Sequence, residues 1–355
     1  MTRVLIVEDS ATMRGHLREA LAPDPQLEVV GEAVDGLRAV EMTARLRPDV
    51  ITMDMMLPGI SGLDATEQIM AECPTPILVV SSADRQELFS TYNALAAGAV
   101  DVLEKPRGDD SDADWSQRLR ATLRMVARIR VITHPRARLD GRLDRRNWVD
   151  PPAAPPVPFT EPLSVVAVGA STGGPAALTE LLRELPPNFR VPVLCVQHIA
   201  ASEQFAVAFS DWLAGQTGRN VRYAQDGTPV SRAAGQVLMA PPDRHLYVRD
   251  HMLRLSDGPP RHSCRPSVDV LFESVATEFG GTAAGCLLTG MGRDGASGLL
   301  QMRSRGAITF AQDEASCTVY GMPREATLLG AAAYVLPPGR IAARLAELHP
   351  VGARR

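Results

Sequence analysis

Residues 165–175 read Val-Val-Ala-Val-Gly-Ala-Ser-Thr-Gly-Gly-Pro, and this stretch decides the fold that we expect for the second half of the chain. Its first four residues are apolar and predict a buried strand. The Gly, Ser and Thr residues that follow predict a tight turn, and Pro175 favours the first turn of a helix. A strand that leads through a glycine-rich turn into a helix is typical of open α/β sheets.

The rest of the C-terminal half repeats this alternation of short apolar runs and helix-like stretches. After 165–168, strands are predicted at 191–196, 237–239, 246–248, 285–288, 307–310 and 333–336. Helices are predicted at 175–185, 205–213, 268–278 and 299–305, with a hairpin near 246–255. Continuous apolar runs that alternate with helices predict a parallel sheet covered on both faces. We therefore expect a doubly wound, Rossmann-like α/β domain.

The N-terminal half shows the same kind of pattern. Strands are predicted at 4–7, 27–30, 50–53, 77–80 and 100–103, and helices at 13–21, 37–45, 62–70 and 115 to about 130. This order predicts a second doubly wound, mainly parallel sheet that is independent of the first.

A Pro/Arg-rich segment separates the two patterns. Residues 151–158 read Pro-Pro-Ala-Ala-Pro-Pro-Val-Pro, and prolines at this density cannot continue a helix or a central strand. We predict a first domain at 1–122, a helix end and linker at 123–162, and a second domain at 163–350. The length of 355 residues fits two domains of ordinary size.

Composition excludes several classes of protein. Apolar residues make up 45% and charged residues 22%, which excludes wholesale disorder. The net charge is −4 and no Lys/Arg-rich block is interleaved with aromatic residues, so we expect no nucleic-acid partner. The five cysteines have no C-x-x-C spacing, which argues against a disulfide framework and a zinc site and favours a reducing compartment. Without a signal-peptide core or about 18 consecutive apolar residues, a soluble cytoplasmic protein that is not inserted in a membrane is expected.

One count within this composition is unusual. Of the 37 basic residues, 36 are Arg and only Lys105 is Lys. Lys105 follows the predicted strand 100–103, at an end of the sheet where ligands bind. A compact, flexible ammonium group differs in reach and geometry from a guanidinium, so we expect this exception to have a chemical reason.

The ends of the N-terminal strands carry a chemically coherent set of side chains. Glu8 and Asp9 follow the first strand, Asp54 ends the third, Ser81 follows the fourth, and Lys105 follows the fifth. Converging carboxylates repel one another unless a hard divalent cation is bound, and Mg²⁺ fits oxygen ligands of this kind. A carboxylate beside such a cation can accept a phosphoryl group.

These residues resemble the receiver domain of two-component signalling. The matching motifs are Val-Glu-Asp-Ser at 7–10, Met-Asp-Met-Met-Leu-Pro at 53–58 and Lys-Pro at 105–106. The resemblance implies a flavodoxin-like fold, Asp54 as phosphoacceptor and a Mg²⁺ site formed by Glu8, Asp9 and Asp54. It also implies that Ser81 and Lys105 form the switch. Receivers often have an aromatic residue where this chain has Val102, which puts an aromatic relay in doubt.

The turn at 169–174 allows three interpretations. It matches G-x-S-x-G, which presents a serine nucleophile at Ser171 above a sheet. It also fits an anion-binding loop at a helix N-terminus, or a purely structural turn. It lacks the G-x-G-x-x-G spacing of a dinucleotide site, which disfavours binding of a nicotinamide or adenosyl cofactor.

A serine nucleophile needs a base and an acid that orients the base. His198 directly follows the predicted strand 191–196 and is the first candidate base, with His245 as its competitor. Asp294 lies in a glycine-flanked turn after the strand 285–288 and is the first candidate acid, with Asp313 as the alternative. Backbone N–H groups in such turns can stabilise an oxyanion.

Residues 163–338 resemble the catalytic domain of the chemotaxis protein-glutamate methylesterase family. Seven short motifs carry the resemblance, at 169–174, 196–198, 240–246, 265–272, 288–296, 311–314 and 320–323. It implies that Ser171 is the nucleophile, His198 the base and Asp294 its orienter, with the turns at Thr172 and Met291 supplying the oxyanion region. It implies no cofactor in this domain. Cys317 is a small local departure, because the family often has Ser or Val there.

The resemblance implies a phosphorylation-regulated serine hydrolase. Its substrates would be glutamate γ-methyl esters, and receptor glutamines for deamidation, on chemoreceptors that adapt during chemotaxis. A histidine kinase of the chemotaxis type would be the phosphodonor. The alternative is a non-catalytic regulator, in which a receiver is coupled to a hydrolase-like module that binds receptors.

Overall fold

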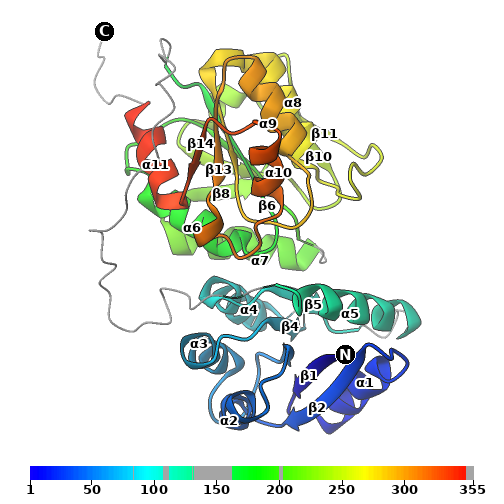
Figure 1. The fold of residues 1–355 in the computed structure, drawn as a ribbon. Helices are drawn as coiled ribbons and strands as arrows, with labels where there is room; N and C mark the ends of the chain where they lie inside the picture. Colours follow the sequence, from blue (N-terminus) through cyan, green and yellow to red (C-terminus); the bar gives the residue numbers. More distant parts are fainter. Residues whose placement is uncertain (83, 107–111, 130, 132–161, 200–202, 349–355) are drawn as a thin grey trace. The chain divides into compact units, whose positions relative to one another are not determined.

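The structure is a computed structural model that describes residues 1–82, 84–106, 112–129, 131, 162–199 and 203–348. The chain divides into two compact units, Met1–Arg146 and Asn147–Arg355 (Figure 1). Nearly all of the predicted linker, and the prolines at 151–158 in particular, lie outside the described residues. Among the described helices, none combines the length and the apolarity needed to cross a membrane.

The first unit is built on a five-stranded parallel sheet with the order β2-β1-β3-β4-β5. Its strands are β1 (Thr2–Val7), β2 (Leu27–Ala33), β3 (Val50–Met53), β4 (Ile77–Ser81) and β5 (Asp101–Glu104). The predicted strands are confirmed, with each end at most three residues from its predicted position. The central strands are buried almost throughout, which is why they read as continuous apolar runs.

Five helices of the described part of this unit cover the sheet. They are α1 (Ala11–Leu21), α2 (Gly36–Leu46), α3 (Gly62–Glu72), α4 (Arg85–Ala97) and α5 (Asp112–Val126). Helices α1 and α5 pack together, and α3 packs against both α2 and α4. The helix predicted from 115 to about 130 is wrong at both ends. It begins three residues earlier, and after Val126 the chain tightens into turns closed by i→i−3 bonds at Arg128 and Ile129.

The second unit has a seven-stranded parallel sheet with the order β14-β13-β12-β6-β7-β9-β8. Its strands are β6 (Val165–Ala170), β7 (Val193–Gln197), β8 (Asn220–Tyr223), β9 (Gln236–Met239), β12 (Ala283–Leu287), β13 (Ile308–Gln312) and β14 (Tyr334–Leu336). The predicted hairpin is confirmed as β10 (His245–Arg249) and β11 (Met252–Ser256), which pair antiparallel. The sequence pattern did not single out β8, because its four residues are too few to show a clear periodic pattern.

Helices cover both faces of this sheet as well (Figure 1). They are α6 (Gly174–Glu184), α7 (Glu203–Thr217), α8 (Val268–Phe279), α9 (Ala296–Ser304), α10 (Met322–Leu328) and α11 (Pro338–Glu347). Helices α6, α7 and α11 pack together, and α8, α9 and α10 form the other group. Helices α10 and α11 were not among those predicted, although each begins with proline in its first turn.

In each sheet, the first strand along the chain is an interior strand, and the chain crosses from it to one side of the sheet and later to the other. In the first sheet β1 lies between β2 and β3, and in the second β6 lies between β12 and β7. Ligands bind at the carboxyl ends of strands at such a reversal. The topology therefore places the residues that follow β1 and β3, and those that follow β6, β7 and β12, at two candidate sites.

Candidate active site and phosphoacceptor site

Three acidic side chains gather at the carboxyl edge of the first sheet. Glu8 and Asp9 follow β1, and Asp54 follows β3, which pairs with β1. One carboxylate oxygen from each lies within 4.8 Å of the other two, a grouping that could hold a metal ion. Glu8 and Asp54 are buried and Asp9 is exposed. Oxygen ligands that are partly open to water suit Mg²⁺, so these residues fit the expected cation.

The ammonium group of Lys105 lies between two of these carboxylates. Its Nζ is 2.9 Å from Asp54 Oδ1 and 3.1 Å from Glu8 Oε2. Burial and the nearby Asp54 still raise the pKa of Glu8 to about 7, and burial raises the pKa of Asp54. Burial alone lowers the pKa of Lys105, but the two carboxylates outweigh it and raise that pKa. One ammonium therefore leaves these acids incompletely stabilised, which favours a further positive charge.

The hydroxyl group of Ser81 has partners other than Asp54. Ser81 ends β4 and is fully buried. It accepts a hydrogen bond from the hydroxyl of Thr91 on α4 at 2.8 Å, and donates to the carbonyl of Ser82 at 3.2 Å. The backbone N–H of Lys105 donates to the Ser81 carbonyl at 2.8 Å, which joins the ends of β4 and β5.

In the second unit, Ser171 lies in the turn between β6 and α6. Its N–H donates to the carbonyl of Thr289 at 3.0 Å, and its own carbonyl accepts from the N–H of Gly174 at 2.7 Å. Gly173 has a φ of +78°, a conformation that favours glycine. A Cβ at Gly290 would lie 2.6 Å from Ser171 Cβ, so the turn after β12 approaches Ser171 too closely for any side chain at that position.

His198 is placed beside Ser171 by strand register. Ala170 pairs with Gln197 across β6 and β7, and the N–H of His198 donates to the Ala170 carbonyl at 2.9 Å. Ser171 and His198 therefore follow paired residues at the same edge. The imidazole Nε2 lies 3.0 Å from Asp294 Oδ2. Within the described residues, no hydrogen bond joins the Ser171 hydroxyl to the imidazole.

Asp294 lies in the turn between β12 and α9, and its carboxylate is buried against the N-terminus of α8. Besides His198, it accepts hydrogen bonds from the Ser267 hydroxyl at 2.7 Å and from the N–H groups of Val268 at 2.7 Å and Asp269 at 3.1 Å. A helix N-terminus favours a negative charge. Burial raises the pKa of Asp294, but His198 and these donors outweigh it and hold the pKa below its ordinary value. The carboxylate is therefore ionised and fixed in orientation.

The other imidazole nitrogen of His198 faces a thiol. Its Nδ1 lies 3.9 Å from the sulfur of Cys264. Burial lowers the pKa of His198, but the hydrogen bond to Asp294 and the contact with Cys264 raise it to about 9. Since Nε2 is held by Asp294, Nδ1 is the nitrogen that can exchange a proton with another group.

The two turns expected to bind an oxyanion lie close together. The Thr172 carbonyl accepts a hydrogen bond from the Thr289 hydroxyl at 3.0 Å, which ties the turn after β6 to the turn after β12. The N–H groups of Thr172 and Met291 make no hydrogen bond to another described residue. Two donors of this kind beside Ser171 are what a developing oxyanion requires.

Both halves of the chain match known families. Residues 166–345 match the family model described as CheB methylesterase, and residues 4–112 match the response regulator receiver domain. A protein-glutamate methylesterase/protein-glutamine glutaminase of Anaeromyxobacter dehalogenans is 46% identical over 98% of this chain and 98% of its own. The chain belongs to the CheB methylesterase family. A relative with the same name from Myxococcus xanthus is 44% identical, covering 90% of this chain and 89% of its own.

A solved structure also resembles the CheB methylesterase domain of this chain. It is the crystal structure of the Thermotoga maritima CheB methylesterase catalytic domain, with 33% sequence identity and a TM-score of 0.49. The similarity covers 52% of this chain and 98% of that one.

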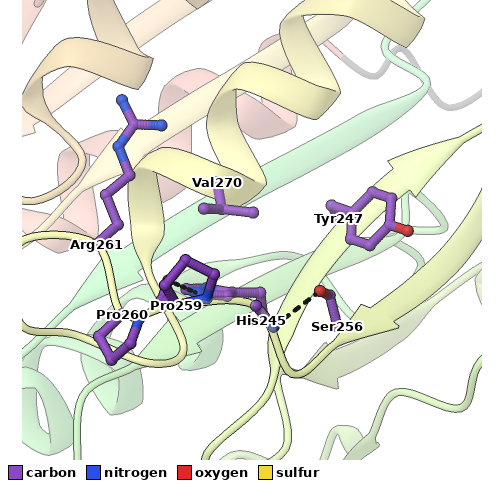
Figure 2. Close-up of a pocket in the computed structure, with 8 residues that line it drawn as sticks. His245, Tyr247, Ser256, Pro259, Pro260, Arg261 and Val270 are labelled. Atoms are coloured by element: carbon purple, nitrogen blue, oxygen red, sulfur yellow. Dashed lines mark hydrogen bonds between the residues drawn. The ribbon is translucent and has the colours of Figure 1, made fainter.

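The alternative base and acid in the methylesterase domain have other contacts. His245 begins β10, and its Nδ1 accepts from the Ser267 N–H at 3.1 Å while Nε2 lies 3.1 Å from the Pro259 carbonyl. Figure 2 shows His245 in the wall of a pocket of about 530 Å³, beside Ser256 and Pro259. With both nitrogens engaged, it has none left to act as a base. Asp313 is bonded to the Ser316 hydroxyl and makes no described contact with His198.

Two residues that position the candidate catalytic groups were not singled out by the sequence. The Gln197 amide donates to the carbonyls of Ser171 and His198, both at 2.9 Å, and so fixes their relative position. Ser267 bonds to Asp294 and also caps α8. Each lies in a motif that carried the resemblance, but spacing alone does not reveal either contact.

Proposed function

We propose that this CheB-family chain is a phosphorylation-regulated serine hydrolase that demethylates glutamate γ-methyl esters on chemoreceptors and deamidates receptor glutamines. The observation that carries the proposal is the His198–Asp294 hydrogen bond at the sheet edge that also presents Ser171. We assign residues 1–122 to the receiver domain, 163–350 to the catalytic domain and 123–162 to the helix end and linker between them.

In the proposed mechanism, Ser171 attacks the ester carbonyl while His198 Nδ1 takes its proton. Asp294 holds Nε2 and stabilises the imidazolium that forms. The N–H groups of Thr172 and Met291 stabilise the oxyanion. His198 then returns the proton to the leaving methoxide, methanol departs, and water hydrolyses the acyl-enzyme by the reverse sequence of proton transfers. A glutamine substrate follows the same path and releases ammonia.

In the receiver, Asp54 is the proposed phosphoacceptor, and Glu8, Asp9 and Asp54 would hold Mg²⁺. A bound Mg²⁺ would neutralise charge on the transferring phosphoryl group. Lys105 already contacts Asp54 and would stay beside its phosphoryl oxygens. Ser81 would exchange its present hydrogen bonds with Thr91 and Ser82 for one to the phosphoryl group. These rearrangements are the proposed switch that raises hydrolase activity.

The proposal names two kinds of protein partner. Methylated chemoreceptors are the substrate, and a histidine kinase of the chemotaxis type supplies the phosphoryl group. Since both contacts take place on the cytoplasmic side of the membrane, we propose that the protein acts in the cytoplasm.

The test is methanol release from methylated receptor in membranes. Ser171→Ala should lower the rate by roughly 10³-fold or more, because it removes the nucleophile. Ser304→Ala is the matched control, since Ser304 is exposed on α9 and its hydroxyl donates to the local backbone carbonyl of Gln301. If Ser171→Ala retained the full rate, the chain would instead be a non-catalytic receiver-coupled regulator that binds receptors.

A further inference from the structure

Cys264 differs from the other four cysteines in its surroundings. Cys73, Cys195, Cys286 and Cys317 are buried, whereas Cys264 is only half-buried. Its sulfur lies 3.9 Å from His198 Nδ1, although the two residues are 66 positions apart in the sequence. The sulfur thus faces the nitrogen that the proposed mechanism uses.

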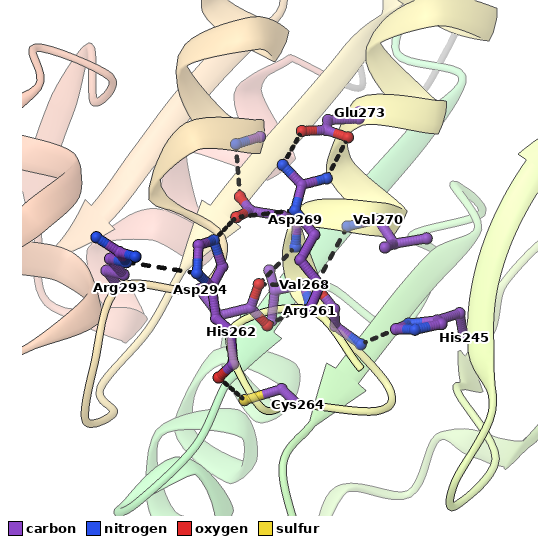
Figure 3. A network of polar contacts seen from close by, with 12 residues as sticks. His245, Arg261, His262, Cys264, Val268, Asp269, Val270, Glu273, Arg293 and Asp294 are labelled. Atoms are coloured by element: carbon purple, nitrogen blue, oxygen red, sulfur yellow. Dashed lines mark hydrogen bonds and ion pairs between the residues drawn. The ribbon is translucent and has the colours of Figure 1, made fainter. Parts of the chain in front are cut away.

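A tight turn holds Cys264 in this position. The N–H of Arg261 donates to the Cys264 carbonyl at 3.0 Å, and the N–H of Cys264 donates to the Arg261 carbonyl at 2.8 Å. Between them, His262 and Ser263 have φ values of +50° and +63°, a left-handed conformation that disfavours side chains. Figure 3 shows this turn beside Asp294. The thiol also donates to the His262 carbonyl at 3.5 Å, which ties the sulfur to the same turn.

A second contact anchors the same turn. His262 Nε2 lies 3.1 Å from Oδ2 of Asp269, a fully buried carboxylate at the start of α8. The Nδ1 of His262 accepts a hydrogen bond from Arg293 Nε at 3.4 Å (Figure 3). The Nδ1 of His262 thus accepts a hydrogen bond and its Nε2 lies close to a carboxylate, whereas the Nδ1 of His198 is directed at a thiol.

The His198 ring is oriented as in a metal-binding histidine. A histidine that binds zinc typically donates its second N–H to a carboxylate, which fixes the tautomer and the ring orientation. Asp294 has this role toward Nε2, and leaves Nδ1 directed toward Cys264. The ligand atoms of His198, Cys264 and Asp294 lie within 4.8 Å of one another.

The distances also suit a soft divalent metal ion. Zinc bound to one imidazole nitrogen and one thiolate at tetrahedral angles separates the two atoms by about 3.5 Å. The observed separation is 3.9 Å, so a small side-chain movement is sufficient. Thiolate and imidazole together favour Zn²⁺ over Mg²⁺, which prefers oxygen ligands.

We propose that His198 Nδ1 and Cys264 Sγ form an inhibitory binding site for Zn²⁺, with water in the remaining coordination positions. Binding releases to solvent the thiol proton and the proton that His198 Nδ1 carries below its pKa, displaces water from Zn²⁺, and forms the Zn–N and Zn–S bonds. The lone pair that would take the Ser171 proton is then occupied, so hydrolysis stops until the metal dissociates. The inhibition rests on the proposed function, whereas the binding site itself does not.

The first test measures inhibition by free Zn²⁺ in the full-length protein, with millimolar Mg²⁺ present to fill the acidic site of the receiver. Each variant is compared with its own zinc-free rate. Cys264→Ser should weaken inhibition at least about tenfold, because even partners that only hydrogen-bond to metal ligands affect affinity that much. Cys317→Ser is the matched control and should be inhibited like the parent protein. Equal inhibition of Cys264→Ser and the parent would overturn the proposal.

The second test does not depend on enzymatic activity. Co²⁺ replaces Zn²⁺, and a thiolate–cobalt charge-transfer band in the near ultraviolet reports a bound sulfur ligand. The band should appear in the parent, in Cys317→Ser and in His262→Gln, and be absent in Cys264→Ser and Cys264→Ala. If no band forms in the parent, the metal site is wrong. If the band forms but the parent releases no methanol, the metal site holds and the proposed hydrolase function fails.

Discussion

The two ring nitrogens of His198 have different surroundings, and this determines how the residue titrates. Nε2 is bonded to the ionised Asp294, and Nδ1 faces Cys264. Although burial lowers the pKa, these two contacts raise it from 6.5 to about 9. The protonated ring therefore stabilises the fold fully below pH 6.5, and this contribution is lost as the pH rises through about 9.

We expect kcat/KM for ester hydrolysis to rise with pH up to about 9, because His198 must be neutral to accept the Ser171 proton. Cys264→Ser should move the midpoint of this profile to lower pH, since it removes one of the contacts that raise the pKa. The measurement is the pH dependence of methanol release in the absence of divalent metals other than Mg²⁺. A profile that is flat between pH 7 and 9 would contradict the assignment of His198 as the base.

The position of Lys105 gives a chemical reason for a lysine at this site. Its Nζ contacts both Asp54 and Glu8, at 2.9 and 3.1 Å. A compact ammonium group fits between the two carboxylates, whereas a planar guanidinium directs its donors in a fixed fork and is larger.

Lys105→Arg should leave phosphorylation of Asp54 detectable but abolish the activation that follows it. The reason is that the charge is kept, while the geometry of the contact to the phosphoryl group changes. The measurement compares incorporation of labelled phosphate with methanol release after addition of a small-molecule phosphodonor. Normal activation in this variant would mean that the lone lysine has no chemical significance.

At the scale of elements, the N-terminus of α8 positions the carboxylate of Asp294, the candidate that orients His198. Ser267 caps this helix by accepting from the Val270 N–H, and its hydroxyl also donates to Asp294. The first N–H groups of α8 donate to the same carboxylate. A single helix start therefore replaces the several side chains that would otherwise be needed to hold a buried charge.

Ser267→Ala should lower both the stability of the second unit, by about 1 kcal/mol, and the rate of hydrolysis, because it removes the cap and one donor to Asp294. Urea unfolding and methanol release measure the two effects. Ser61→Ala is the matched control, since Ser61 caps α3 of the first unit in the same way but lies in the other unit. It should lower stability without changing the basal rate of hydrolysis. Full activity of Ser267→Ala would show that Asp294 does not depend on this bond.

At the scale of the whole molecule, two units built on the same principle carry two different chemistries. In each, the first strand of the parallel sheet lies at the reversal of strand order, and the candidate site residues follow this strand and its neighbours. The first unit places carboxylates and an ammonium there, and the second places a serine, a histidine and an aspartate.

Asp54→Asn should abolish activation of the hydrolase by a phosphodonor and leave its basal activity, because the phosphoacceptor carboxylate is lost while Ser171, His198 and Asp294 are unchanged. The measurement is methanol release with and without the phosphodonor and Mg²⁺. In the parent protein the rate should rise severalfold, and chelation of Mg²⁺ should prevent the rise. A response that persists in Asp54→Asn would place the phosphoacceptor elsewhere.

Much of the fold could be predicted from periodicity. Buried parallel strands such as β1, β6 and β12 are continuous apolar runs, which is why the pattern located them within a few residues. The short edge strand β8 and helices such as α4 and α10 were not singled out, because their apolar residues do not form a clear periodic pattern. The end of α5 was predicted too late. After Val126 the backbone forms i→i−3 turns, and this change in hydrogen bonding leaves no mark in the apolar pattern.

By itself, the sequence determined the fold class, the family resemblance and the candidate residues Ser171, His198, Asp294 and Asp54, because strand ends and motifs can be read along the chain. Only the tertiary structure decided which nitrogen of His198 faces Asp294, that Ser267 and Gln197 fix the candidate catalytic groups, and that Cys264 lies beside the imidazole. Cysteine spacing argued against a zinc site, since spacing reports only neighbours in sequence. The contact between His198 and Cys264 joins residues 66 positions apart, and only the packing of the strained turn at 261–264 against the sheet edge creates it.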